Sequence, residues 1–394
     1  MNLRSKIHMA RMKREVNMSR SKRWLALFLA LVAVGIGLFM AVNFTVDPTG
    51  YFTVERGADS VGANGYTRAA KCKYIKKNSD QYNAVVLGGS KAGVLSTELL
   101  SQYSGKSYYN FYVAYGCFSD FLTYARYLVN TAGVEEITLH LSSIEVQKYS
   151  RADENEIYEV PAVVNGSLPE LILENLNYLC RDITASIDYI RTGNEELERG
   201  LDSIVTGERN YSYPYSLMEE DREAYNDKYV LVRYEKRLKA MFDKTEPTLA
   251  AAEDNIAAMK KIKKLCDKNG VKLNVVIGPT FMSEIPLFEC EAYYDYLREL
   301  VQITDMWDFS GFIPENRNPY NFVNEGHYDN AVADLMVNTM YGKEQKEGFG
   351  TLLTKDNIEE YLAARQAEYD RLKKEYKENG TLELYDMDHE SYIG

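Results

Sequence analysis

The chain has 394 residues, of which 45% are hydrophobic and 26% are charged, and its formal net charge is −12. This is the composition of a folded globular protein with one large or two medium domains. Its acidity excludes nucleic acid as the expected partner, because a phosphate backbone attracts basic surfaces.

The N-terminal region differs from the rest of the chain. Its first 23 residues carry eight basic side chains and one acidic side chain, or +7, so the remainder carries −19, the difference between −12 and +7. An uncharged run from Trp24 to Val42 follows, and about 18 to 20 apolar residues match the thickness of a bilayer core. Because basic flanks stay in the cytoplasm, the sequence predicts a cytosolic tail over 1–23, a single-pass signal anchor over 24–43 and an extracellular main domain.

A cleavable signal peptide is the alternative interpretation of this segment. Its apolar region is normally about 7 to 15 residues long and is followed by small residues at the cleavage site. Here the run is longer, and the segment from Phe39 to Asn43 is a poor cleavage site. The sequence therefore favours an anchor that stays in the cell membrane.

Strand and helix patterns alternate after the anchor. Helices are expected over 65–82, 94–100 and 118–131, and strands over 84–88, 108–112 and 136–141. This order is typical of a parallel sheet with helical connections. The pattern resumes with helices over 248–268, 291–303 and 330–341 and strands over 272–279 and 305–309.

Residues 150–245 interrupt the pattern. They are polar, rich in Tyr, Glu and Asn, and show no strand pattern, so we expect a helical or partly irregular insertion within an α/β domain over 46–345. A charged helix is predicted over 355–377, within a C-terminal segment over 355–394. The five cysteines have no CxxC spacing, so no zinc site is expected.

Ser90 is the most informative residue of the chain. It ends the turn Gly88-Gly89-Ser90 directly after an apolar strand, and open α/β sheets bind ligands at the carboxyl ends of their strands. Serine becomes a nucleophile only when a base reaches it. Of the four histidines, His327 is the best placed to be that base; His140, inside an apolar run, is expected in the core, and Lys91 is expected to be an exposed lysine.

These segments together resemble the SGNH/GDSL hydrolases. Gly88-Gly89-Ser90 is similar to the serine block of that family, and Gly116 falls where the family has its oxyanion glycine. Asp308 and the segment from Asn324 to Tyr328 lie in a region similar to its last block. The resemblance covers roughly residues 80–150 and 250–342. It is closest to the membrane-anchored envelope proteins of lipoteichoic acid D-alanylation and polysaccharide O-acetylation.

The resemblance implies a flavodoxin-like three-layer α/β/α sandwich with a parallel sheet. It also implies ester chemistry on cell-envelope glycopolymers, often beside a membrane-bound O-acyltransferase, without a metal or diffusible cofactor. Ser90 would be the nucleophile, His327 the base, and the backbone N–H groups of Ser90 and Gly116 the oxyanion donors.

The chain departs from the family at two places. Asn324 stands where the family has the aspartate that orients the histidine, so Glu325, Asp329 and Asp308 are considered as substitute acids. The third strand leads into Ser142 without the family's Gly-x-Asn-Asp, so one oxyanion donor is missing or comes from elsewhere. Two hypotheses follow: a serine esterase or O-acyltransferase, and a non-catalytic scaffold that binds envelope polymer or a membrane-bound O-acyltransferase.

Overall fold

The computed structural model of the chain describes residues 3–62, 67–192, 201–243, 249–344 and 346–384. The chain divides into two compact units. The first contains Met1–Pro48 and Ser167–Asn194, and the second contains Thr49–Gly166 and Glu195–Gly394. The predicted C-terminal segment therefore belongs to the same unit as the α/β domain, except that residues 385–394 lie outside the described residues.

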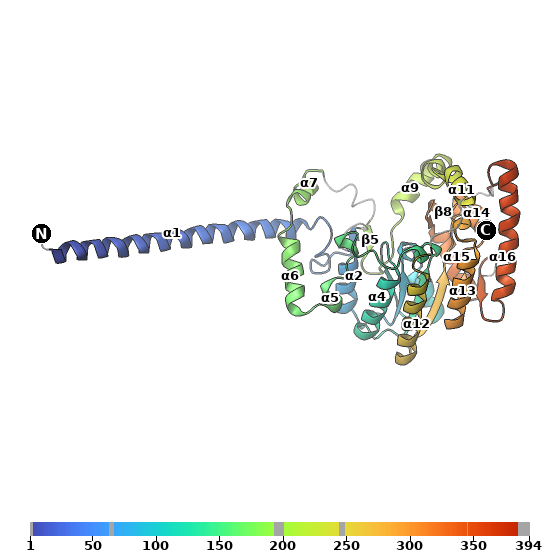
Figure 1. Cartoon of the computed structure of the whole chain (residues 1–394), viewed down its shortest axis with the longest axis horizontal. Helices are drawn as coiled ribbons and strands as arrows, with labels where there is room; N and C mark the ends of the chain where they lie inside the picture. Colours follow the sequence, from blue (N-terminus) through green and yellow to red (C-terminus); the bar gives the residue numbers. More distant parts are fainter. Residues whose placement is uncertain (1–2, 63–66, 193–200, 244–248, 345, 385–394) are drawn as a thin grey trace. The chain divides into compact units, whose positions relative to one another are not determined.

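The second unit is an α/β domain with a mostly parallel sheet, as the sequence predicts (Figure 1). Five parallel strands lie in the spatial order β3-β2-β4-β6-β7, and β10 adds an antiparallel edge beside β7. Every residue of the three strands β2, β3 and β4 is buried, as expected when both faces of a parallel sheet are covered. The strands are β2 (Ala84–Gly88), β3 (Tyr108–Tyr112), β4 (Glu136–Leu141), β6 (Lys272–Ile277), β7 (Met306–Asp308) and β10 (Thr351–Leu353).

Alternating side chains of the strands enter two separate hydrophobic clusters. Val85 and Leu87 join a cluster that includes residues of α4, α12 and α13. Ala84 and Val86 join the other, which includes residues of α3 and α15. Each cluster thus covers one face of the sheet, because neighbouring residues of a strand point to opposite faces. The helices are α2 (Thr67–Lys77), α3 (Thr97–Ser104), α4 (Phe118–Thr131), α12 (Ala252–Asn269), α13 (Glu291–Ile303) and α15 (Asn330–Met340).

The helix predicted over 94–100 is wrong in its bounds. A 3-10 segment, η1 (Ser90–Val94), comes first, and α3 begins at Thr97. The reason is the N-cap: Ser96 Oγ accepts a hydrogen bond from the Leu99 N–H at 3.2 Å, which satisfies one of the first amides of the helix.

The insertion over 150–245 divides between the two units. It contains a strand, β5 (Leu201–Ser203), although none was predicted; β5 pairs antiparallel with β1 (Ser60–Gly62), and three residues are too few to show alternation in the sequence. The other elements of the second unit in this region are η3 (Glu156–Tyr158), α5 (Ala162–Asn165), α9 (Ser212–Glu220), α10 (Arg222–Tyr225), the π-helical η4 (Asn226–Val230) and α11 (Tyr234–Phe242); η2 (Ser143–Gln147) precedes it, directly after β4.

The first unit joins a long helix to two short ones. Within α1 (Leu3–Val46), the stretch Arg20–Val46 is long and apolar enough to span a membrane. Asn43, near its end, donates from Nδ2 to the carbonyl oxygens of Leu179 (3.0 Å) and Arg181 (2.9 Å). These bonds connect α1 to the region between α6 (Leu168–Leu179) and α7 (Thr184–Thr192).

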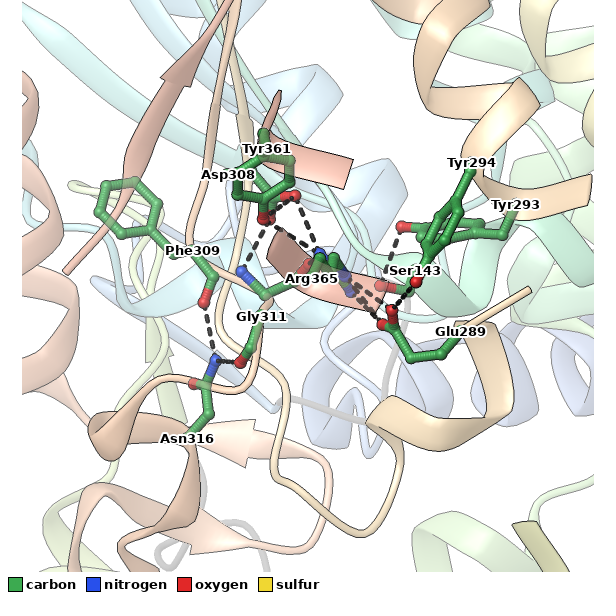
Figure 2. Close-up of polar contacts among 11 residues, drawn as sticks. Ser143, Glu289, Tyr293, Tyr294, Asp308, Phe309, Gly311, Asn316, Tyr361 and Arg365 are labelled. Atoms are coloured by element: carbon green, nitrogen blue, oxygen red, sulfur yellow. Dashed lines mark hydrogen bonds and ion pairs between the residues drawn. The ribbon is translucent and has the colours of Figure 1, made fainter. Parts of the chain in front are cut away.

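The C-terminal helix α16 (Ile358–Asn379), drawn in red in Figure 1, inserts a charged residue into the core of the α/β unit. Arg365 is 5% exposed; its Nη2 lies 2.6 Å from Glu289 Oε1 and its Nη1 3.1 Å from Asp308 Oδ2 (Figure 2). Tyr361 Oη also donates to Asp308 Oδ2, at 2.9 Å. Both carboxylates are buried, so the guanidinium neutralises charges that water cannot reach.

We predict that Arg365→Met destabilises the fold strongly, because it leaves two buried carboxylates without a counter-ion. Removing one partner of a buried ion pair costs about 3 to 5 kcal/mol. Chemical denaturation of the detergent-solubilised chain measures this loss. Arg371→Met on the same helix is the control, because the exposed Arg371 pairs with the surface residues Glu368 and Glu375, and exposed pairs contribute about 0 to 1 kcal/mol. Equal losses for the two variants would contradict the role of Arg365.

Candidate active site

Ser90 lies at the point where the strand order of the sheet reverses. β2 pairs with β3 on one side and β4 on the other, and open α/β sheets bind ligands in the crevice at such a point. The turn after β2 is tight: a Cβ on Gly88 would lie 2.6 Å from the His140 carbonyl oxygen, so no other residue fits there. Ser90 is the first residue of η1, and the N–H groups at the start of a helix have no acceptor within it.

A short hairpin brings His327 to Ser90. Its strands are β8 (Phe322–Asn324) and β9 (His327–Tyr328), and Asn324 pairs with His327. The distance from Ser90 Oγ to His327 Nε2 is 2.8 Å. The structure thus brings together two residues that are 237 positions apart, at the hydrogen-bond distance that a nucleophile and its base require.

Asn324 determines which nitrogen of His327 carries the proton. Asn324 Oδ1 accepts a hydrogen bond from the Gly326 N–H at 2.9 Å, which identifies that atom of the amide as the oxygen. The same oxygen lies 3.0 Å from His327 Nδ1. Since an oxygen only accepts, Nδ1 must donate, and the lone pair of the neutral ring is then on Nε2, facing Ser90. This is the tautomer that a general base needs.

Each of the three candidate acids has a partner other than His327. Glu325 forms ion pairs with Arg233 and Arg237. Asp329 caps α15 by accepting from the Val332 N–H at 3.0 Å. Asp308 belongs to the buried Arg365 cluster (Figure 2).

The predicted oxyanion donors differ in availability. The Gly116 N–H donates to the Val113 carbonyl oxygen at 2.9 Å, in a tight turn where Tyr115 has φ 56°, so this N–H is already used. The Ser90 N–H remains a donor at the start of η1. A second hydroxyl adjoins the site: the Ser142 side chain faces the backbone of Glu145 in a capping box at the start of η2, and its O–H has no acceptor among the described residues.

Ser90 and His327 open onto a cavity of about 250 Å³. One acid of its wall, Glu145, accepts from the Ser142 N–H at 2.8 Å, and burial raises its pKa to about 8. A carboxyl with that pKa is mostly protonated at neutral pH. Besides these residues, the cavity wall includes Gly89, Lys91, Tyr115, Gly116, Cys117, Ile144, Lys148, Arg151, Glu284 and Gly326.

Arg209 is the site residue that sequence reasoning missed. Its Nη1 lies 3.4 Å from His327 Nε2, although it comes from the insertion, where no motif distinguishes it from other arginines. Among the described residues, Arg209 forms no direct ion pair with a carboxylate. Arg209 therefore places a positive charge beside the nucleophile and its base.

A buried lysine holds the loop that carries Arg209. Lys71 Nζ donates to the carbonyl oxygens of Gly207 (2.7 Å), Asn110 (3.1 Å) and Tyr112 (3.2 Å). Gly207 has φ 76°, and a Cβ there would lie 2.1 Å from the Asn110 carbonyl oxygen. Only glycine allows this close approach of the loop to β3, so Lys71 and Gly207 act as positioning residues for Arg209.

His327 is held in its neutral form. Burial lowers its pKa well below the ordinary value of 6.5, and the positive charges of Arg209 and Lys91 lower that pKa further. Lys91 is half-buried at the cavity, so its prediction as an exposed lysine was wrong. His140 is fully buried and bonds through Nε2 to the Tyr328 hydroxyl at 2.9 Å, as predicted for a core histidine.

Comparisons with family models, with curated proteins and with solved structures find no match to this chain. The interpretation of the site therefore depends on its own geometry and chemistry.

The lowered pKa of His327 predicts how the reactivity of Ser90 varies with pH. A base with a depressed pKa stays neutral at lower pH, so the labelling rate with a fluorophosphonate should fall only below pH 6.5. Arg209→Gln removes a charge that lowers this pKa, so the inflection should move to higher pH.

Arg151→Gln is the control, because Arg151 lines the cavity but pairs with Glu154 and is not among the charges that shift the pKa of His327. An inflection that stays in place in Arg209→Gln would contradict the electrostatic role of Arg209.

Proposed function

We propose that the protein is an extracytoplasmic serine esterase or O-acyltransferase that acts on acyl esters of cell-envelope glycopolymers. The observation that carries the proposal is the line of hydrogen bonds from Ser90 Oγ through His327 to Asn324 Oδ1, at 2.8 and 3.0 Å. It supplies a nucleophile, a base in the productive tautomer and an orienting group for the base.

In the first half of the reaction, Ser90 Oγ forms a bond to the acyl carbon while His327 Nε2 takes the hydroxyl proton. The tetrahedral intermediate then expels the alcohol, which receives that proton from Nε2, and the acyl group stays on Ser90. In the second half, water or a sugar hydroxyl attacks the acyl carbon and loses its proton to Nε2. Ser90 leaves as the acyl group departs and recovers that proton, so the enzyme is regenerated.

The oxyanion needs donors aimed at its position. The Ser90 N–H is one, at the positive end of η1, and the O–H of Ser142, which has no acceptor among the described residues, is the second that we propose. Ser142 follows the third parallel strand. The SGNH family has its asparagine block at this place, and this chain lacks that block. The positive charge of Arg209 also favours a developing negative charge beside Ser90.

The order of the strands and the position of the basic tail support the proposed fold and membrane orientation. The parallel strands, numbered by their order in the chain, lie in the spatial order 2-1-3-4-5, which is that of flavodoxin-like folds. We therefore retain the flavodoxin-like α/β/α sandwich and the SGNH resemblance as part of the proposal. The basic tail before Arg20–Val46 supports a cytosolic N-terminus and an extracellular main domain, where a membrane-bound O-acyltransferase is the proposed partner.

A non-catalytic scaffold is the second candidate, and Asn324 favours it. A neutral amide holds the imidazole ring but does not stabilise the imidazolium that forms when His327 accepts a proton. Replacing the orienting aspartate by asparagine lowers turnover on the order of 10⁴-fold in serine proteases, where the asparagine imposes the wrong tautomer. Here the tautomer is the productive one, so we expect a smaller penalty and retain the enzyme as the first candidate.

Fluorophosphonate labelling of the purified chain, measured by intact mass, tests the proposal. We expect one adduct on the parent chain, none on Ser90→Ala and a large loss of rate for His327→Ala. Cys117→Ser, on the same cavity wall, is the control and should label normally. A parent chain that labels no better than Ser90→Ala would favour the scaffold, which binds polymer or a partner without an activated serine.

We predict that Asn324→Asp makes the site faster. A carboxylate there still accepts from Nδ1 and also stabilises the imidazolium, so ester hydrolysis should rise by roughly 10- to 100-fold, less than the ~10⁴ seen where the tautomer also changes. Asn324→Ala should lower the rate, because the ring loses its orienting acceptor. The rate of 4-nitrophenyl ester hydrolysis measures both, and a slower Asn324→Asp would contradict the proposed role of residue 324.

A further inference from the structure

Two helices of the first unit present apolar side chains to solvent. On α6, Leu168, Ile172, Leu173 and Leu176 are between 43% and 70% exposed. On α7, Ile187 and Ile190 are 39% and 65% exposed. A group of exposed large aliphatic residues on adjacent segments indicates a surface that something covers.

The apolar residues of α6 share one side of the helix. At about 100° per residue, positions 168, 172, 173 and 176 fall within an arc of roughly 140°. Glu170 and Asn177, both exposed, lie outside that arc. Tyr178 points elsewhere, because its hydroxyl donates to Asp47 Oδ1 at 2.7 Å. The helix therefore has an inner side against the end of α1, an apolar side and a polar side.

Hydrogen bonds fix this helical pair at the end of the membrane-spanning stretch. The Asn43 side chain bonds to the carbonyl oxygens of Leu179 and Arg181, and Ser186 Oγ of α7 donates to Asn43 Oδ1 at 2.8 Å. Asn43 and Ser186 are both buried. Since Asn43 lies in the last turn of Arg20–Val46, a bilayer that contains this stretch has its surface near α6 and α7.

We propose that α6 and α7 form an interfacial membrane contact, with their apolar side chains among the lipid acyl chains where α1 leaves the bilayer. An amphipathic helix at an interface buries its apolar face about 5 to 10 Å into the boundary of headgroups and acyl chains. Residues 168–192 contain Glu170, Glu174, Asp182 and Asp188 against Arg181 and Arg191. This acidic balance gives anionic headgroups no attraction, so the contact depends on apolar burial and a zwitterionic bilayer suffices.

The test places an environment-sensitive fluorophore on each side of α6 in the full chain, reconstituted in phosphatidylcholine vesicles. Exposed Cys180 is replaced by Ser, and Ile172→Cys (apolar side) and Asn177→Cys (polar side) are labelled. The C180S chain gives the labelling background. We expect lipids brominated near the headgroup end of their chains to quench the label at 172 at least about twofold more than at 177. Adding phosphatidylglycerol should leave this ratio unchanged.

Equal quenching of the two labels by brominated lipid would overturn the proposal. Aqueous iodide reaches labels in water, so the proposal requires it to quench the label at 177 more than the label at 172. Equal quenching by iodide would therefore overturn the proposal as well. A label at 172 protected from both quenchers would also overturn it, because protein rather than lipid would then cover the surface. These outcomes do not depend on whether Ser90 is reactive, so they are distinct from a failure of the proposed ester chemistry.

Discussion

The Asn324 amide oxygen accepts two hydrogen bonds, one from the Gly326 N–H and one from His327 Nδ1. The first orients the amide, and the second fixes the imidazole tautomer. Because Nδ1 carries the proton, the Nε2 lone pair faces Ser90 Oγ, and a hydroxyl that would otherwise be inert has a base at 2.8 Å. The proposed chemistry depends on this one oxygen, which holds the ring without supplying a charge.

The surroundings of the site act in the same direction. Burial and the charges of Arg209 and Lys91 keep His327 neutral, so it can accept a proton but is poorly stabilised once it has done so. An orienting carboxylate would reverse that balance, and the candidate acids serve other purposes: a helix cap, surface ion pairs and the Arg365 cluster. For the proposed ester chemistry, this arrangement predicts slow turnover.

The parts predicted from the sequence were those with a local signal. Strands β2, β3 and β4 matched their predicted bounds, because fully buried parallel strands are continuous apolar runs between polar or glycine turns. Ser90 was predicted from the glycine turn that follows β2, and His327 from the resemblance of the segment Asn324 to Tyr328 to the last block of the SGNH family. Arg209 and the partners of Arg365 were not predicted, because their roles come from contacts between distant segments. β5 and β10 have three residues each, too few to show a periodic pattern.

The most direct measurement of the central claim is the rate of fluorophosphonate labelling at Ser90 in the parent chain, Asn324→Asp and Asn324→Ala, each followed against pH. The account predicts labelling of the parent chain that Ser90→Ala abolishes, faster labelling with aspartate and slower labelling with alanine. It also predicts that the inflection of Asn324→Asp moves to higher pH, because a carboxylate stabilises the protonated ring. A serine equally unreactive in all three chains would contradict the account and leave a scaffold in its place.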